Sequence, residues 1–372
     1  MNFRIVSRLV FLVAIFAFGT VMVGCSDDDK STCPSSTGLW SWAALGSGAN
    51  NYVWTCEMYN NKLFVSGDFD SCGGVAANHI AALNGSAWGP VGSGLDATAI
   101  DFCVYDGKLI AGGYFTHAGG VAANYIAAWD GTTWSPLGQG LNNAVFDLCV
   151  YNGMLIAAGQ FTTAGGVSAN RIAMWNGSSW SPIGTGMNGA IHSLFADSTI
   201  LFAGGWFTTA GGATANYVAY WNGSSWNAFG TGVSGGTNTG VYSMAIYDNR
   251  LIVGGNFTSA GGVSANHIAS TVITNWYPLG SGMSGTFGGN PVVLGLELFD
   301  DKLIACGQFI TAGGIGVNGI ASWDGSEWTP LSSGMNNVVE DIAVTSDCIY
   351  AVGMFTTAGG VAANYIAEWK QR

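Results

Sequence analysis

The side chains that could carry out chemistry are few and widely spaced. The four histidines are His79, His117, His192 and His267, and no HxxxH, CxxC or paired-carboxylate motif groups them with other ligands. Zinc and copper sites usually show such spacing, because several side chains must converge on one ion. The sequence therefore predicts no metal centre and no cofactor, and it marks no residue as catalytic.

These residues belong to a repeated unit that determines where they lie. The asparagine before the third strand of each unit recurs at intervals of 46, 46, 46, 50, 52 and 46 residues: Asn78, Asn124, Asn170, Asn216, Asn266, Asn318 and Asn364. A period of roughly 40 to 50 residues is typical of propeller blades. In one copy, apolar and polar residues alternate and Asn-Gly pairs mark tight turns. This pattern predicts four antiparallel strands at 146–152, 155–161, 171–175 and 180–184.

The last unit indicates how the array closes. It runs over 341–372 and stops just after Trp369, where the other units enter their fourth strand. The missing strand is found at the other end of the chain, because 39–48 aligns with 131–140 and places Trp42 on Trp134. Closing a ring removes exposed sheet ends. We therefore predict an all-β, seven-bladed β-propeller over 39–372, whose last blade takes three strands from the C-terminus and one from the N-terminus.

Two runs carry a resemblance to a known class. The run YDGKLIAGG at 105–113, followed by WDGTTWSPL at 129–137, has the kelch order of hairpin, glycine pair, aromatic and tryptophan. The chain thus resembles kelch and galactose-oxidase propellers, in the divergent form of Rax2-type cell-surface repeats. This resemblance implies the fold but not one function, since kelch-like propellers include enzymes, adaptors and adhesins. The copper ligands of galactose oxidase, Tyr and His with a Cys-linked Tyr, cannot be placed in this sequence.

The N-terminus has the pattern of an export signal. Residues 1–24 contain Arg4 and Arg8, then an apolar run that ends at a small residue before Cys25. The run Met-Val-Gly-Cys at 22–25 resembles a bacterial lipobox, which implies lipidation of Cys25; an ordinary signal peptide is the alternative. The acidic run at 26–30 resembles that of surface-exported lipoproteins of Bacteroidetes-like bacteria. We expect a lipidated tether at 25–38, an outer-membrane location with possible surface exposure, and membrane contact only through the lipid.

Composition narrows the range of partners. The formal net charge is −12, and removing Arg4 and Arg8 leaves 8 basic against 22 acidic residues, or about −14. Nucleic acid and anionic membrane surfaces require basic patches, so neither is an expected partner. The 58 glycines suit many tight turns, and 9% charged with 49% hydrophobic residues suits strands that are mostly buried. We expect a monomeric propeller.

The eight cysteines are placed irregularly. Cys56, near the start of a first strand, and Cys72, in the loop between the second and third strands, should lie at the same face of the first blade, which makes them disulfide candidates. Cys33 and Cys348 form a second candidate pair near the closing blade. The others are expected to be small buried hydrophobic residues: Cys103, Cys149 and Cys306.

Positions that differ between copies indicate where a ligand could bind. Three sets of positions vary while the Gly-x-Phe frame around them stays fixed. If the first strands line a central channel, all three sets lie near the axis at one face. The candidate binding residues are Trp54, Phe146, His192 and Tyr242 at the entry of first strands, Asp101, Asp147 and Asp341 just after it, and Tyr114 and Trp206 between Gly and Phe.

Aromatic rings beside carboxylates suit sugars, which stack on rings and hydrogen-bond through their hydroxyls. Our leading hypothesis is a cell-envelope lipoprotein that binds a glycan or a surface protein without catalysis. A polysaccharide-active hydrolase, lyase or oxidase is a second hypothesis, with Asp101, Asp147, Asp341 and His192 as acid–base groups. A structural scaffold of an envelope assembly is a third. Aromatic residues that merely fill the channel mouth are the alternative to all three.

Overall fold

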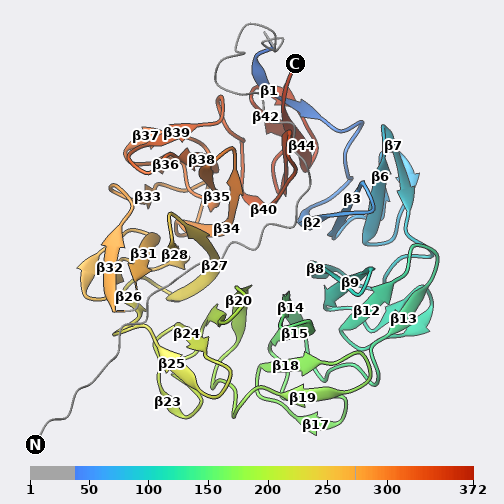
Figure 1. Ribbon diagram of the computed structural model, residues 1–372. Helices are drawn as coiled ribbons and strands as arrows, with labels where there is room; N and C mark the ends of the chain where they lie inside the picture. The colour runs from blue at the N-terminus through green and yellow to red at the C-terminus, as the bar shows by residue number, and fades with distance from the viewer. Residues whose placement is uncertain (1–37, 273) are drawn as a thin grey trace, which may run out of the picture. The chain divides into compact units, whose positions relative to one another are not determined.

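The computed structural model describes residues 38–272 and 274–372. The predicted signal peptide, Cys25, Cys33 and nearly all of the predicted tether lie outside these residues. Residues Leu39–Arg372 form one compact unit. The described residues contain no helix and seven four-stranded antiparallel sheets, whose first strands surround a common centre (Figure 1). The predicted all-β, seven-bladed propeller is confirmed.

Each sheet is one blade, with its first strand innermost. Blade 1 contains β2 (Val53–Tyr59), β3 (Lys62–Gly67), β6 (Ile80–Asn84) and β7 (Ala87–Pro90), and blade 2 contains β8 (Ala99–Tyr105), β9 (Lys108–Gly113), β12 (Ile126–Trp129) and β13 (Trp134–Pro136). Blade 3 contains β14 (Val145–Tyr151), β15 (Met154–Gly159), β18 (Ile172–Trp175) and β19 (Trp180–Pro182). Blade 4 contains β20 (Ile191–Ala196), β21 (Leu201–Gly205), β24 (Val218–Trp221) and β25 (Trp226–Ala228). Blade 5 contains β27 (Gly240–Tyr247), β28 (Arg250–Asn256), β31 (Ile268–Val272) and β32 (Asn275–Pro278); blade 6 contains β34 (Val292–Phe299), β35 (Lys302–Gln308), β38 (Ile320–Trp323) and β39 (Trp328–Pro330); blade 7 contains β40 (Val339–Val344), β41 (Cys348–Gly353), β44 (Ile366–Gln371) and β1 (Trp40–Ala44).

A short hairpin lies between the second and third strands of every blade. The sequence pattern predicted only a loop there. The hairpins are β4 (Ser71–Cys72) with β5 (Val75–Ala76), β10 (His117–Ala118) with β11 (Val121–Ala122), β16 (Thr163–Ala164) with β17 (Val167–Ser168), β22 (Thr209–Ala210) with β23 (Ala213–Thr214), β29 (Ser259–Ala260) with β30 (Val263–Ser264), β36 (Thr311–Ala312) with β37 (Ile315–Gly316), and β42 (Thr357–Ala358) with β43 (Val361–Ala362). Two of them gain a third strand, β26 (Val233–Ser234) beside β29 and β33 (Met283–Ser284) beside β36.

The two Asn-Gly turns of a blade differ in their conformation. Asn152 and Gly153 have φ of 51° and 72°, as a type I′ turn between the first two strands requires. At Asn176 the turn is held by its side chain instead, whose Oδ1 accepts the N–H groups of Ser178 (3.0 Å) and Ser179 (2.9 Å). An Asx turn of this kind satisfies backbone donors without positive φ at the asparagine.

Blade 7 closes the ring as predicted. β1 pairs with β44 over five residues, with Trp42 opposite Trp369. The Trp42 indole Nε1 donates to the carbonyl oxygen of Leu331 in blade 6 at 2.9 Å. The fourth-strand tryptophan of blade 3, Trp180, makes the same bond to Leu137 of blade 2. The N-terminal strand therefore repeats the inter-blade contact of an ordinary fourth strand.

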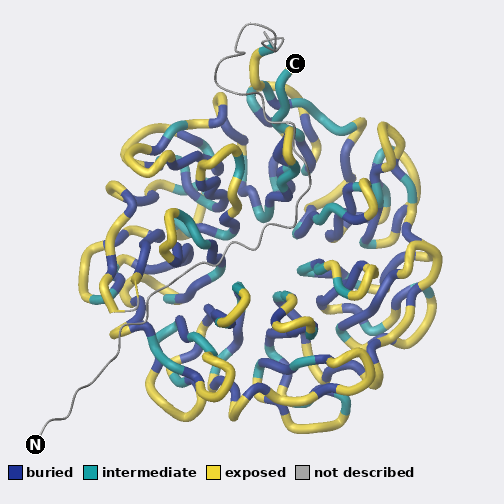
Figure 2. The backbone as a smooth tube through the Cα atoms, in the orientation of Figure 1, coloured by how far each residue is buried: buried dark blue, intermediate teal, exposed yellow. Residues whose placement is uncertain are grey.

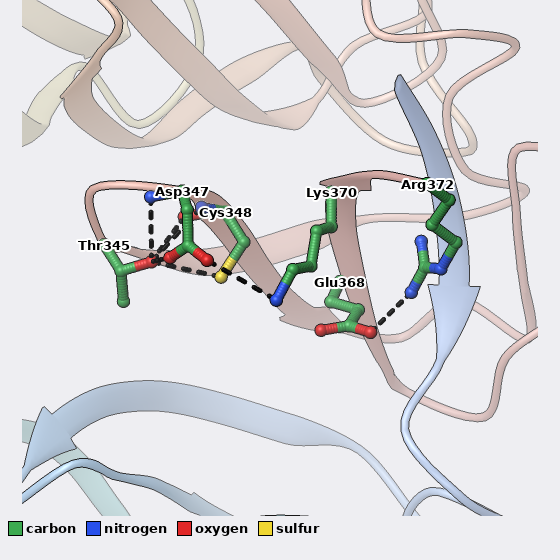
Figure 3. A network of polar contacts seen from close by, with 6 residues as sticks. All are labelled: Thr345, Asp347, Cys348, Glu368, Lys370 and Arg372. Atoms are coloured by element: carbon green, nitrogen blue, oxygen red, sulfur yellow. Dashed lines mark hydrogen bonds and ion pairs between the residues drawn. The ribbon is translucent and has the colours of Figure 1, made fainter. Parts of the chain in front are cut away.

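Exposed ion pairs lie along the edge of this closing blade (Figure 3). The Lys370 ammonium is 3.4 Å from the Asp347 carboxylate, and Arg372 pairs with Glu368. Arg372 also donates to the Ser41 carbonyl oxygen at 3.0 Å, which links the two chain ends. Because exposed pairs contribute little, the strand pairing and the buried side chain of Trp42 account for most of the closure.

The core lies between neighbouring blades. One cluster joins Ile110 and Ile126 of blade 2 to Val145 and Leu155 of blade 3. Buried residues follow the strands, whereas exposed residues lie mainly at the turns and loops (Figure 2). The fixed glycine of the Gly-x-Phe frame has a steric reason, since a Cβ at Gly159 would lie 2.2 Å from the Ala144 carbonyl oxygen.

Candidate binding site at the channel mouth

A β-bulge in every first strand builds the site. The pairing of first and second strands skips one residue in all seven blades, for example Phe146 between Val145 and Asp147. A bulge leaves its extra residue unpaired and redirects the side chain. The seven skipped residues, here called the bulge ring, are Trp54, Ile100, Phe146, His192, Tyr242, Leu294 and Glu340.

The bulge ring lines one cavity. This cavity has a volume of about 690 Å³, and all seven bulge-ring residues contribute to its wall. The structure also places Tyr114, Asp101, Asp147 and Asp341 on its wall. Eight of the nine residues selected from the sequence therefore converge on one space. Their role in binding stays a prediction.

The ninth residue, Trp206, joins an aromatic cluster beside the cavity. The rings of Tyr114 and Phe146 are 6.0 Å apart, Phe146 stacks on His192 at 4.7 Å, and His192 lies 4.3 Å from Trp206. Tyr242 completes the cluster, since its hydroxyl accepts a hydrogen bond from the Trp206 indole at 2.8 Å. Tyr114 and Trp206 are 50% and 44% exposed, whereas Phe146 is buried. The cluster thus presents two open ring faces held by a packed centre.

His192 is enclosed by these rings. Its Nε2 is buried and has no hydrogen-bond partner among the described residues. Burial lowers the pKa of the imidazole to about 4, so the ring is neutral at neutral pH. In this position His192 acts as part of the aromatic surface and is poorly placed to exchange protons with a substrate.

The three aspartates connect neighbouring first strands. Asp101 accepts the N–H of Leu148 in the next blade at 2.7 Å. Asp147 does the same for Leu194 at 2.6 Å. In blade 7, Asp341 accepts the backbone N–H of Cys56 at 3.0 Å, across the closure of the ring. The bonded N–H groups follow the bulges, so these carboxylates satisfy donors in the inner wall.

Burial dominates the protonation of these aspartates. Desolvation, then the nearby charges of Asp147 and Asp341, raise the pKa of Asp101 well above its usual range. Desolvation also raises the pKa of Asp147 to about 7. Protonation of Asp101 therefore relieves the repulsion between the two charges. Desolvation raises the pKa of Asp341 to about 6.

Three glutamates add to the acidic character of the cavity. Glu57, Glu297 and Glu340 all line it. Desolvation raises the pKa of each to about 7, and the charge of Asp341 adds to the effect in every case. No ion pair of the described residues involves a cavity carboxylate, because those pairs use Asp96, Asp347 and Glu368.

Two long connections border the aromatic cluster. The loops at 233–241 and 283–293 meet through the Asn290 amide, which donates to the Thr237 hydroxyl at 2.7 Å. Trp206 packs against the end of the first loop, since a Cβ at Gly240 would lie 2.5 Å from its ring. Trp206 therefore lies beside the first loop, which the second loop contacts.

The cysteines do not contribute a bridge to this site. Cys56 and Cys72 are separate free thiols, so the structure lacks the disulfide considered from the sequence. Cys56 points into the cavity wall from β2, whereas Cys72 lies in the β4–β5 hairpin opposite Ala49. In the part of the chain that the structure describes, no group of three or more His, Cys, Asp and Glu side chains could hold a metal ion. None of the described residues forms a helix able to cross a membrane.

The sequence repeats identified the residue at the start of each first strand as variable between copies, but they did not predict the bulge. The extra residue looks like any other in an alternating strand. The signal that could have revealed it is the run of two channel-facing residues in succession, such as Phe146-Asp147 or Glu340-Asp341. Strict alternation forbids this, so such a pair indicates a bulge.

Comparisons with known proteins agree on the fold. The family described as "Domain of unknown function (DUF5122) beta-propeller" matches residues 106–127 and 248–269. No curated protein matches the chain. Among solved structures, the WD40 β-propeller domain of Doa1 is similar with a TM-score of 0.55 and 14% identity, covering 90% of this chain and 98% of that one. The computationally designed Ika8 protein has a TM-score of 0.51 and 12% identity, covering 89% and 99%.

A third similar structure is the extracellular domain of a putative hybrid two-component system from B. thetaiotaomicron. Its TM-score is 0.59 at 11% identity, and the match covers 89% of this chain and 40% of that chain. At such identities, structural likeness is evidence of fold and leaves function to the individual site. Together with the match to a described propeller family, these neighbours identify the chain as a β-propeller.

Proposed function

We propose that this propeller is a non-catalytic binding module that holds a glycan at the mouth of its channel. The observation that carries the proposal is the aromatic cluster beside the cavity of about 690 Å³. Sugars bind to proteins by stacking apolar ring faces on aromatic planes and by hydrogen bonds from their hydroxyls. The exposed rings of Tyr114 and Trp206 supply the planes, and the two loops joined by Thr237 and Asn290 supply polar groups.

The hydrogen bonds of the acidic residues favour binding over catalysis. Asp101, Asp147 and Asp341 accept backbone N–H groups, and His192 is enclosed by rings. An acid–base pair needs access to the reacting atoms in hydrogen-bonding distance. The commitment of these four side chains to the scaffold supports a non-catalytic role.

We further propose where the module works. The N-terminal pattern supports export, with a signal peptide at 1–24, lipidation of Cys25 and a tether at 25–38 that leads into β1. The likeness to kelch-like and Rax2-type surface repeats, and to one extracellular domain, supports the same placement. In this proposal the monomeric propeller is anchored in a bacterial outer membrane by its lipid and presents the channel mouth to envelope or surface glycans.

A glycan array tests the function directly. The soluble fragment 34–372 should bind a restricted set of glycans. A Tyr114→Ala/Trp206→Ala double variant should bind them at least about tenfold more weakly, because each aromatic stack contributes about 1 kcal/mol. Tyr277→Ala is the matched control, since Tyr277 is similarly exposed but lies on the outer strand β32. No selective binding, or equal binding by the double variant, would contradict the proposal.

A further inference from the structure

The bulge ring contains a single carboxylate among aromatic and aliphatic side chains. Glu340 shares the ring with Trp54, Phe146, His192 and Tyr242, and the two remaining members are Ile100 and Leu294. Because His192 is neutral, Glu340 is the only ring residue that can be charged near neutral pH. Around the mouth of the cavity, aromatic faces and one negative charge thus surround the same space.

Glu340 has no partner of its own. Its carboxylate makes no hydrogen bond or ion pair with any described residue, although the side chain is partly buried. The next residue, Asp341, differs in this respect, since it accepts hydrogen bonds from Thr55 and from the backbone of Cys56 and Ile342. A partly buried carboxylate without donors is costly, so it either takes up a proton or pairs with a cation from outside the protein.

The groups facing Glu340 are also acidic or neutral. Asp341 lies on the same strand, Leu294 and Glu297 come from β34, and Trp54 and Glu57 come from β2. The described lysines and arginines form no ion pair with any of these acids. The cavity therefore carries an excess of carboxylates that a cation in the ligand would neutralise.

Aromatic rings and an unpaired carboxylate on the wall of one cavity suit one kind of cation in particular. An alkylammonium group is attracted to the faces of Trp and Tyr through cation–π interactions, and it forms hydrogen bonds and an ion pair with a carboxylate. A bare metal ion would need several oxygen or nitrogen ligands at short distance. No such group of ligands exists among the described residues.

We propose that the ligand of the channel mouth carries a protonated amine, which enters the bulge ring and pairs with Glu340. This inference rests on the proposed glycan-binding function and specifies the glycan as one containing an amino sugar with a free, non-acetylated amine. One sugar of the oligosaccharide stacks on the exposed rings of Tyr114 and Trp206, and an ammonium group of the same ligand pairs with Glu340 on the wall of the same cavity. Neutral sugars lack the group that Glu340 would bind.

The test compares two oligosaccharides that differ only in the amine. β-Linked glucosamine oligomers and N-acetylglucosamine oligomers of equal length are titrated into the full-length protein by calorimetry. The amine form should bind at least about tenfold more tightly than the acetylated form, since acetylation removes the cation that pairs with Glu340. Glu340→Gln, which keeps the shape of the side chain, should abolish this difference. Glu327→Gln, on an exposed outer strand hairpin, is the matched control and should preserve it.

The outcomes separate the two proposals. Equal affinity for both oligomers, or an unchanged preference in Glu340→Gln, would overturn the ammonium inference and leave glycan binding intact. Binding of neither oligomer, together with an array on which no glycan is bound, would overturn the proposed function and this inference with it. Oligolysine, titrated in parallel, identifies the remaining case: its binding without any sugar binding would overturn both and assign the ring to a protein ligand.

Discussion

The interiors of the blades repeat the same contacts, whereas the channel mouth changes from blade to blade. The phenylalanine of the Gly-x-Phe frame is fully buried in all seven copies: Phe69, Phe115, Phe161, Phe207, Phe257, Phe309 and Phe355. The bulge ring contains aromatic, aliphatic and acidic residues at equivalent positions. Interior positions are fixed by close packing, while a bulge residue also borders the cavity, where side chains of several sizes fit. The two regions should therefore respond differently to mutation.

The two residues Glu340 and Asp341 show this difference within one strand. Asp341 accepts a backbone hydrogen bond from the neighbouring blade, so it is part of the propeller scaffold, here called the frame, although it faces the cavity. Glu340, one position earlier, has no such bond and belongs to the variable mouth. Position in the cavity alone therefore does not identify the structural residues, whereas hydrogen bonds to the neighbouring blade do.

The largest effect is expected where the frame closes. Trp42→Ala removes a side chain that is 4% exposed and the hydrogen bond to Leu331. We expect a loss of about 3 to 5 kcal/mol in the free energy of unfolding, as for other buried aromatic residues. Urea unfolding followed by tryptophan fluorescence measures it. Trp40→Ala, on the same strand but 38% exposed, is the control and should lose less than half as much. Equal losses would mean that β1 packs like a surface strand.

The frame could be predicted from the sequence because its pattern repeats. The truncated seventh unit and the extra Leu39–Gly48 segment had one consistent arrangement, and the pairing of Trp42 with Trp369 confirms it. The strand positions were predicted within a few residues. The short hairpins such as β16–β17 were missed, because two-residue strands carry no periodicity.

The site was harder to predict because it depends on details that leave no repeat signal. The variable positions were recognised, and eight of the nine selected residues line the cavity. Which of them are structural could not be predicted, since the bonds from Asp101 to Leu148 and from Asp147 to Leu194 cross between blades. The disulfide considered between Cys56 and Cys72 is absent, and both are free thiols. Two cysteines at the same face of a blade need not be in contact, and the sequence does not give the distance between them.

A smaller effect should separate Asp341 from Glu340. Asp341→Ala leaves the N–H groups of Cys56 and Ile342 without their acceptor, so we expect a loss of about 1 to 3 kcal/mol in the free energy of unfolding. Glu340→Gln should change it by less than about 0.5 kcal/mol at pH 4, because no bond is lost and the carboxyl is protonated there, as neutral as the amide that replaces it. Both values come from urea unfolding at pH 4. Similar losses for the two variants would remove the distinction between frame and mouth.

Stability should also depend on pH through the cavity carboxylates. The folded-state pKa values of Glu57 and Glu340 are raised to about 7 and that of Asp341 to about 6, above the roughly 4 expected in the unfolded chain. A raised carboxyl pKa means that the folded state binds protons more tightly, so its contribution is present below pH 4 and is lost as pH rises through 6 and 7. The melting temperature should therefore fall between pH 5 and pH 8. The fall should be shallower in Glu340→Gln, since one raised group is gone and the protein no longer carries that charge in the mouth. A melting temperature that rises over this range, or an equal fall in the variant, would show that burial does not raise the pKa values of these carboxyl groups.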